Sequence, residues 1–351
     1  MTEAYVSEVD LGNGWTGLRL SADELEVTIL PQQGCDVHSL VDLRTGVDVL
    51  WKTPWAMPPI GAGRWNAEDE AEWLERYSGG WQLLCPNGGD ASEAPGGLTW
   101  GWHGEASRVP WQLADFGVDD EGTAFADLRT RLTRAPLQIE RRVAVRGGVL
   151  SIDESVTNTS PDPVEIMWSH HPAFGEPLIG PATRIYTSAT TITADATDAG
   201  ADLEPSATAA WPHPQAPAGA EPADFSRIPS TPRATLAYLG EFEESGWYAM
   251  VNPEIDLGVA LRWDADLFPH AWYWQELRAS GGAPWWGEVY VTAIEPASTI
   301  PGHGIAHAKA QGANLVKLAG GETRSTRIEA TTFAPTGEVR RIGPDGAVEQ
   351  G

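Results

Sequence analysis

The feature that most constrains this chain is a series of short segments in which apolar and polar residues alternate. Residues 24–30 (ELEVTIL), 138–146 (QIERRVAVR) and 149–156 (VLSIDESV) show it most clearly. A period of two is typical of β-strands with one buried face. Further strands are expected at residues 165–168, 184–187, 246–251, 258–263, 288–294 and 326–330.

Turn residues separate these segments, and helical patterns are scarce. Gly147 and Gly148 lie between two alternating runs, which predicts a β-hairpin. The best helical candidate is residues 66–77, with Asn66 as the N-cap and acidic residues in the first turn. The sequence therefore predicts an all-β protein, a large antiparallel β-sandwich with few short helices.

The domain organisation is predicted to be simple. Residues 1–335 form one domain, interrupted at about 193–232 by an insertion rich in Ala, Pro, Asp and Gly. Such an insertion is either a disordered or draped surface loop, or a lid or subunit contact. Residues 336–351 are expected to form a tail or a short hairpin that turns at Pro344, Asp345 and Gly346.

The charge of the chain excludes some partners. The formal net charge is −26 and the sequence pI is about 4.5, so nucleic acids and anionic membranes would be repelled. No apolar stretch approaches the roughly 18 residues that a membrane helix needs. Residues 1–12 lack the apolar segment of a signal peptide. We expect a cytoplasmic protein without nucleic-acid or membrane partners, for which a homodimer is one allowed assembly.

Two cysteines, Cys35 and Cys85, cannot make a disulfide framework or a CxxC zinc pattern. Two free thiols are the expectation for a reducing compartment. Tryptophan, by contrast, is abundant, with 17 residues. Indole rings fill sandwich cores, and they also stack on the C–H faces of sugar rings.

Four polar segments, well separated along the chain, carry candidate chemistry. They are residues 77–89 (YSGGWQLLCPNGG), 100–105 (WGWHGE), 168–175 (WSHHPAFG) and 293–296 (AIEP). His170 and His171 are adjacent in an extended segment, so only one of them can enter a given pocket. Glu295 follows an apolar run, where a carboxylate is costly to bury unless it is paired or functional.

Histidines and a carboxylate supply the parts for general acid–base catalysis near neutral pH. They also supply the parts for a metal site, and local spacing does not decide between the two. His303 and His307 are four residues apart, but Gly302 and Gly304 argue against a helix that would align them. The sequence has no phosphate-binding loop, dinucleotide fingerprint or serine nucleophile elbow.

In their order along the chain, these segments resemble the aldose 1-epimerase (galactose mutarotase-like) family, as a divergent branch. Residues 25–50 look like its opening strands, and 318–322 (LAGGE) like its closing segment. The Gly-Gly-Trp to Pro-Asn-Gly-Gly stretch resembles its first substrate loop. Trp102-His103-Gly104 and Ser169 to Gly175 resemble its two histidine motifs, and Ile294-Glu295-Pro296 its glutamate motif. The resemblance covers about residues 5–333.

The resemblance implies an open cleft on a β-sandwich and a mechanism without cofactor or metal. Glu295 would be the general base on the anomeric hydroxyl, and His171 the general acid on the ring oxygen. His103 would hydrogen-bond the ring oxygen or a neighbouring hydroxyl. Substrate-binding candidates are Asn87, Arg76, Trp102, His170, Trp274 and Glu276.

The chain departs from the family at its specificity residues. Asn87 is followed by Gly88 where the family has an arginine, so that arginine is either missing or supplied from elsewhere in the chain, with Arg76 as the candidate. The family's sugar-binding aspartate has no clean counterpart, and Asp264, Asp266 and Glu276 are the candidates. Trp272 and Trp274 alternate, so both are expected to line one face.

The sequence therefore predicts a mutarotase that interconverts the anomers of an aldose or a modified sugar. Two alternatives stay open: another carbohydrate-active enzyme on this scaffold, such as an isomerase, a lyase or a glycoside-cleaving accessory protein, and a non-catalytic sugar-binding protein.

Overall fold

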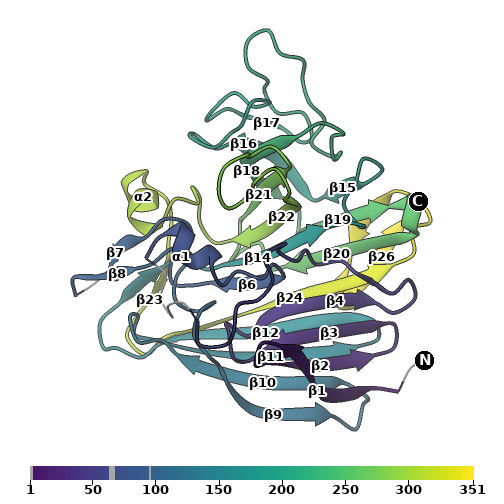
Figure 1. The fold of residues 1–351 in the computed structure, drawn as a ribbon. Coiled ribbons are helices and arrows are strands. Elements are labelled where there is room, and N and C mark those ends of the chain that lie inside the picture. The colour runs from purple at the N-terminus through teal and green to yellow at the C-terminus, as the bar shows by residue number, and fades with distance from the viewer. Residues whose placement is uncertain (1–2, 63–67, 95) are drawn as a thin grey trace.

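The structure is a computed structural model that describes residues 3–62, 68–94 and 96–351. Within these residues the chain forms two large antiparallel sheets, one of 12 strands and one of eight (Figure 1). The predicted all-β sandwich with few short helices is confirmed. The alternating segments become strands because each has one face that packs in the interior and one that meets solvent.

The larger sheet follows the order β1-β2-β3-β4-β6-β14-β22-β21-β18-β16-β17, and β5 pairs with β4. Its strands are β1 (Tyr5–Gly12), β2 (Trp15–Ala22), β3 (Leu25–Leu30), β4 (Asp36–Asp42), β5 (Val47–Asp48), β6 (Trp81–Leu84), β14 (Ser169–Gly175), β16 (Ala189–Ala194), β17 (Thr208–Ala210), β18 (Arg233–Phe242), β21 (His270–Leu277) and β22 (Tyr290–Ala297).

The smaller sheet follows the order β15-β19-β20-β24-β12-β11-β10-β9. Its strands are β9 (Gln112–Val118), β10 (Ala124–Arg131), β11 (Leu137–Arg146), β12 (Val149–Asn158), β15 (Arg184–Thr187), β19 (Gly246–Asn252), β20 (Leu257–Trp263) and β24 (Thr323–Phe333). Two-stranded sheets pair β7 (Ser92–Ala94) with β8 (Leu98–Trp100), β13 (Val164–Ile166) with β23 (Val316–Leu318), and β25 (Val339–Ile342) with β26 (Val348–Gln350).

Both predicted hairpins are present. Arg146 pairs with Val149 across Gly147 and Gly148, both of which have positive φ. In the C-terminal segment, β25 pairs with β26 across a short 3₁₀ turn at Pro344–Gly346. Asp345 lies in the left-handed region there, with φ 54°, as a tight turn requires.

The main core lies between the sheets, where β2 and β3 face β10, β11 and β12 (Figure 1). A buried ion pair joins the neighbouring strands β11 and β12 of the smaller sheet. The Arg141 guanidinium donates to the Glu154 carboxylate, and Nε lies 2.7 Å from Oε2. Glu154 also accepts a hydrogen bond from the Trp168 indole at 2.7 Å, and Arg141 donates to the Cys35 carbonyl at 2.9 Å. These bonds offset the cost of burying two charges.

The helices are short. Helix α1 spans Glu70–Leu74, with Asp69 accepting a hydrogen bond from the Glu72 amide as N-cap. The predicted helix at 66–77 is therefore correct in place but too long, and its expected N-cap, Asn66, lies outside the described residues. Helix α2 spans Ile305–Ala310 and includes His307, where the neighbouring glycines argued against a helix.

The insertion at 193–232 is partly ordered by sheet pairing. Its first residues complete β16, and β17 extends the larger sheet at the end opposite the N-terminal strand β1 (Figure 1). Residues 197, 198 and 200 line a cleft. This first part is ordered, because hydrogen bonds fix Asp195 and its neighbours.

Both cysteines are free and buried, as expected. Among the described residues, none of the helices has the length and apolar character needed to cross a membrane.

Candidate active site

A cleft with a volume of about 650 Å³ opens on one face of the larger sheet. That volume is in the usual range for small-ligand sites. Strands β14, β18, β21 and β22, helix α1 and the loops around them contribute its walls. The residues most relevant to chemistry are Trp73, Tyr77, Trp102, His103, His171, Trp274, Glu276, Glu295 and His303.

Glu295 and His171 meet at the floor of the cleft. Oε1 of Glu295 lies 3.7 Å from Nε2 of His171. They come from β22 and β14, which are neighbours in the larger sheet and pair Ala173 with Ala293. The sequence suggested that Glu295 follows the end of a strand. It lies inside β22, because the strand continues to Ala297.

Burial governs the protonation of this pair. Glu295 is 2% exposed, and its desolvation raises the pKa of the carboxyl well above its usual value. Burial lowers the pKa of His171 to about 4. Within the described chain, Oε2 of Glu295 and Nδ1 of His171 have no hydrogen-bond partner. Two buried polar groups that line a cleft and each have an atom without a hydrogen-bond partner are a candidate catalytic pair.

His103 is held by the loop after β6. The Gly89 amide donates to Nδ1 of His103 at 2.9 Å, and the His103 amide donates back to the Gly89 carbonyl at 2.9 Å. Nδ1 is therefore an acceptor, which leaves the proton on Nε2. Burial and the neighbouring His171 lower the pKa of His103. The ring is thus a neutral hydrogen-bond donor, 5.8 Å from His171 between ring centres.

Gly89 is required for this arrangement. Its φ is +80°, and a Cβ there would lie 1.8 Å from the Gly302 carbonyl oxygen. His103 itself adopts φ 55°, a strained conformation for a histidine. The imidazole of His103 is thus held in the cleft by a strained backbone conformation.

Aromatic rings surround the two histidines. Ring centres of Trp73 and Trp102 lie 4.8 and 5.0 Å from His103, and that of Trp274 lies 5.9 Å from His171. Trp272 and Trp274 both line the cleft, as their alternation predicted. Flat indole walls match the apolar faces of a sugar ring.

Three predicted substrate residues lie elsewhere. His170 points into the core, where Nδ1 accepts from the Trp81 indole at 3.1 Å and Nε2 lies 3.6 Å from Glu154. Asn87 is fully buried and binds backbone groups of Asp90, Gly101 and Ile305. Arg76 is buried against Trp15, 5.5 Å from the ring centre, and is absent from the residues that line the cleft.

The aspartate candidates also change. Asp264 and Asp266 do not line the cleft, and Asp264 accepts from the Asp266 amide within its own turn. Glu276 does line it, but its carboxylate accepts from the Ala279 and Ser280 amides and from the Ser280 hydroxyl. Glu276 therefore fixes the loop that follows β21.

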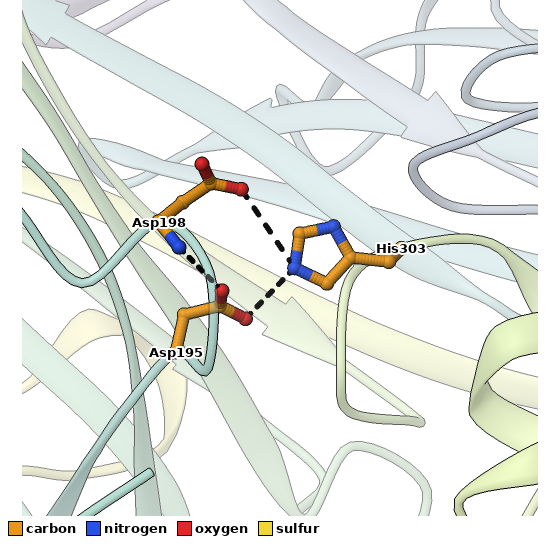
Figure 2. Close-up of side chains that lie close together, drawn as sticks. All are labelled: Asp195, Asp198 and His303. Carbon is orange, nitrogen blue, oxygen red and sulfur yellow. Dashed lines mark hydrogen bonds and ion pairs between the residues drawn. The ribbon is translucent and has the colours of Figure 1, made fainter. Parts of the chain in front are cut away.

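The structure adds residues that the sequence interpretation did not select. Asp195, from the insertion, accepts from Nε2 of His303 at 2.9 Å (Figure 2). It also accepts from the Tyr238 hydroxyl at 2.5 Å. Its other oxygen accepts from the Thr197 and Asp198 amides, both at 2.8 Å. These bonds hold the pKa of Asp195 below its usual value, and the Asp195 contact raises the pKa of His303.

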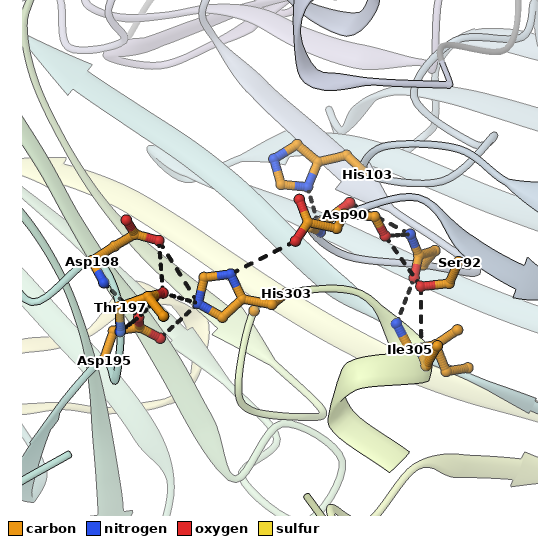
Figure 3. A network of polar contacts seen from close by, with 12 residues as sticks. Asp90, Ser92, His103, Asp195, Thr197, Asp198, His303 and Ile305 are labelled. Carbon is orange, nitrogen blue, oxygen red and sulfur yellow. Dashed lines mark hydrogen bonds and ion pairs between the residues drawn. The ribbon is translucent and has the colours of Figure 1, made fainter. Parts of the chain in front are cut away.

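The contact with Asp195 requires a proton on Nε2 of His303, so Nδ1 is turned the other way, 4.0 Å from Asp90. Figure 3 shows Asp90 between His103 and His303. Gly89 binds His103, while Gly88 accepts from the Gly304 amide at 2.8 Å beside His303. One loop thus positions both imidazoles.

Asp195, Asp198 and His303 each place one ligand atom within 4.8 Å of the others. A metal ion needs those lone pairs to be available. Here, Asp195 already accepts hydrogen bonds at both oxygens, and Nε2 of His303 donates to it. The arrangement is that of a carboxylate orienting an imidazole.

Fold and cleft together define a protein with the galactose mutarotase-like sandwich. The chain belongs to the family described as a domain of unknown function (DUF4432), whose profile matches residues 12–332. No curated protein matches it in sequence.

Solved structures with the same fold share little sequence. A candidate aldose 1-epimerase from Klebsiella pneumoniae superposes with a TM-score of 0.70 at 16% identity, over 95% of this chain and 85% of the other. A galactose mutarotase-like protein from Clostridium acetobutylicum gives 0.64 at 14% identity, over 95% and 99%. A candidate aldose 1-epimerase from Escherichia coli gives 0.61 at 15%, over 92% and 100%.

Proposed function

We propose that this protein is a mutarotase, an isomerase that interconverts the α and β anomers of an aldose or a modified sugar. The observation that carries the proposal is the buried contact of 3.7 Å between Glu295 and His171 on the floor of an aromatic cleft. Opening a sugar ring needs a base on one oxygen and an acid on another oxygen of the same carbon. An acid and a base must therefore lie side by side.

In the proposed reaction, Glu295 accepts the proton of the anomeric hydroxyl while His171 donates a proton to the ring oxygen. The bond between the anomeric carbon and the ring oxygen breaks, and a carbonyl forms. Rotation about the adjacent C–C bond and closure with both proton transfers reversed gives the other anomer. The protons balance within the pair, so the reaction needs no redox partner.

His103 and His303 have supporting roles in this proposal. The Nε2–H of His103 donates to a sugar oxygen beside the reacting carbon, since its Nδ1 is engaged by Gly89. Nδ1 of His303 contacts a sugar hydroxyl at the wall of the cleft, because Asp195 holds its other nitrogen. Both are fixed before substrate arrives, which lowers the entropic cost of binding.

The absence of Arg76 and Asn87 from the cleft lining favours a substrate, or a reaction, that differs from those of the family that the motifs resemble. Another reaction at the anomeric end of a sugar is therefore the second candidate.

The test is anomer interconversion measured by NMR magnetisation exchange across neutral, acidic and sulfonated sugars. Wild-type protein is compared with Glu295→Gln, and Glu140→Gln on the exposed side of β11 is the matched control. Acceleration by the wild type and the control, but not by Glu295→Gln, supports the proposal. Binding without acceleration of any sugar contradicts it.

A further inference from the structure

A second hollow of about 520 Å³ adjoins the cleft. Tryptophans and carboxylates line it: Trp55, Trp285, Trp286, Glu70, Glu75 and Glu288. Glu70, Leu74 and Trp285 line both hollows, so the two lie side by side. The proposed chemistry at Glu295 and His171 uses none of the tryptophans here.

Indole rings run from one hollow into the other. Trp274, in the wall of the cleft, lies 5.7 Å from Trp285 between ring centres, and Trp285 lies 6.4 Å from Trp55. Trp286 is 65% exposed, more than any other large apolar side chain among the described residues. Trp286 lines the same hollow as Trp55 and Trp285, and exposed apolar side chains gathered in one place are typical of a binding surface.

The loop between β21 and β22 holds Trp286 in this exposed position. The backbone of Trp286 has φ 49°, which is strained for a tryptophan. The Trp285 and Trp286 amides both donate to the Gly282 carbonyl, at 3.0 and 2.9 Å. Glu276 fixes the start of the loop through the Ala279 and Ser280 amides. The exposure of the indole is thus a property of an ordered loop.

The chemistry of the hollow suits a sugar ring. Indole faces stack on the C–H face of a pyranose, while carboxylates accept hydrogen bonds from its hydroxyls. Glu70 of α1, Glu75 at the C-cap of that helix and Glu288 of the β21–β22 loop supply such acceptors around the tryptophans.

We infer that the substrate is a disaccharide or a longer oligosaccharide, whose reducing-end ring occupies the cleft and whose second ring stacks on Trp285 and Trp286. This inference rests on the proposed function, because it places the free anomeric centre at Glu295 and His171. The second ring makes no covalent step and adds affinity only.

The experiment compares dissociation constants by isothermal titration calorimetry for matched sugars. Glucose is paired with maltose, cellobiose and lactose, and galactose with galactobiose. In the wild type, at least one disaccharide should bind about 3- to 10-fold tighter than its reducing-end monosaccharide. Trp286→Ala should remove this advantage and leave the monosaccharide constant unchanged, whereas Trp286→Phe should retain part of it. Phe116→Ala, an exposed aromatic on β9, is the control.

A wild type that binds no disaccharide better than its monosaccharide overturns the inference. So does a Trp286→Ala variant that keeps the advantage. Anomer exchange on the same samples separates the two proposals. A disaccharide advantage without exchange contradicts the mutarotase assignment alone, and exchange without an advantage contradicts the second subsite alone.

Discussion

The carboxylate of Glu295 lies 3.7 Å from the imidazole of His171, although 124 positions separate the two residues in the numbering (295 − 171). Burial raises the pKa of Glu295 and lowers that of His171, so it favours the neutral form of each. The pair therefore carries one proton, on the carboxyl group. Proton transfer on the sugar requires that proton to move to the imidazole as the carboxylate becomes a base.

Replacing His171 by Asn should remove the general acid and keep the cleft. We expect the rate of anomer interconversion to fall about 100- to 10,000-fold, with sugar binding largely retained. NMR magnetisation exchange measures the rate, and ligand-observed NMR measures binding. A variant with normal turnover would show that His171 has no catalytic role.

The dependence of kcat/KM on pH should reflect the joint protonation of Glu295 and His171. Catalysis needs one proton on Glu295 and His171 together, so kcat/KM falls when both are protonated and again when neither is. The lower limb is expected near pH 4, the pKa to which burial brings His171, and the upper limb at the raised pKa of Glu295. Rates measured from pH 3.5 to 9 test this. A single limb near the ordinary histidine pKa would contradict it.

His303→Gln should weaken sugar binding more than chemistry. Loss of one positioned hydrogen bond predicts a KM about 3- to 10-fold higher with a smaller change in kcat. Asp195→Asn, which weakens the hold on the imidazole, should shift KM in the same direction. His307→Gln is the control, since that exposed residue touches the His303 ring, at 5.6 Å between centres, but does not line the cleft. An unchanged KM in His303→Gln would remove His303 from the substrate site.

Glu154→Gln should destabilise the fold and leave the cleft residues in place. It leaves the buried Arg141 charge without its partner, which predicts a free energy of unfolding lower by about 3–5 kcal/mol. Asp153→Asn, at the next position on β12, breaks an exposed pair with Arg327 and should cost only about 0–1 kcal/mol. Urea unfolding of both variants tests the difference. An equal decrease in the free energy of unfolding of both variants would mean that the buried ion pair contributes no more to stability than the exposed one.

Local pattern was enough to predict the strands. Residues 184–187 were predicted as a strand and form β15 with the same bounds, and 138–146 differs from β11 by one residue. The physical reason is that a strand with one buried face alternates apolar and polar residues, and this period of two can be recognised in the sequence. The two hairpins followed from turn glycines and a Pro-Asp-Gly turn for the same reason.

Motifs also selected His103, His171, Glu295 and Trp102, the alternation of aromatic residues selected Trp274, and all five line one cleft. Alternation further predicted that only one of His170 and His171 could enter it. Which one did so depended on the core, where Trp81 and Glu154 engage His170.

Contacts between distant segments were decided only by the tertiary structure. Asp195 and His303 are 108 residues apart and meet because the insertion joins β16 beside the loop before α2. Arg76 was expected in the cleft, yet the packing of its segment against Trp15 buries it elsewhere. The sequence thus determined the sheet elements and the catalytic residue types, because both are local. Strand order decided the partners of each side chain, because side-chain burial depends on which strands become neighbours in the sheet.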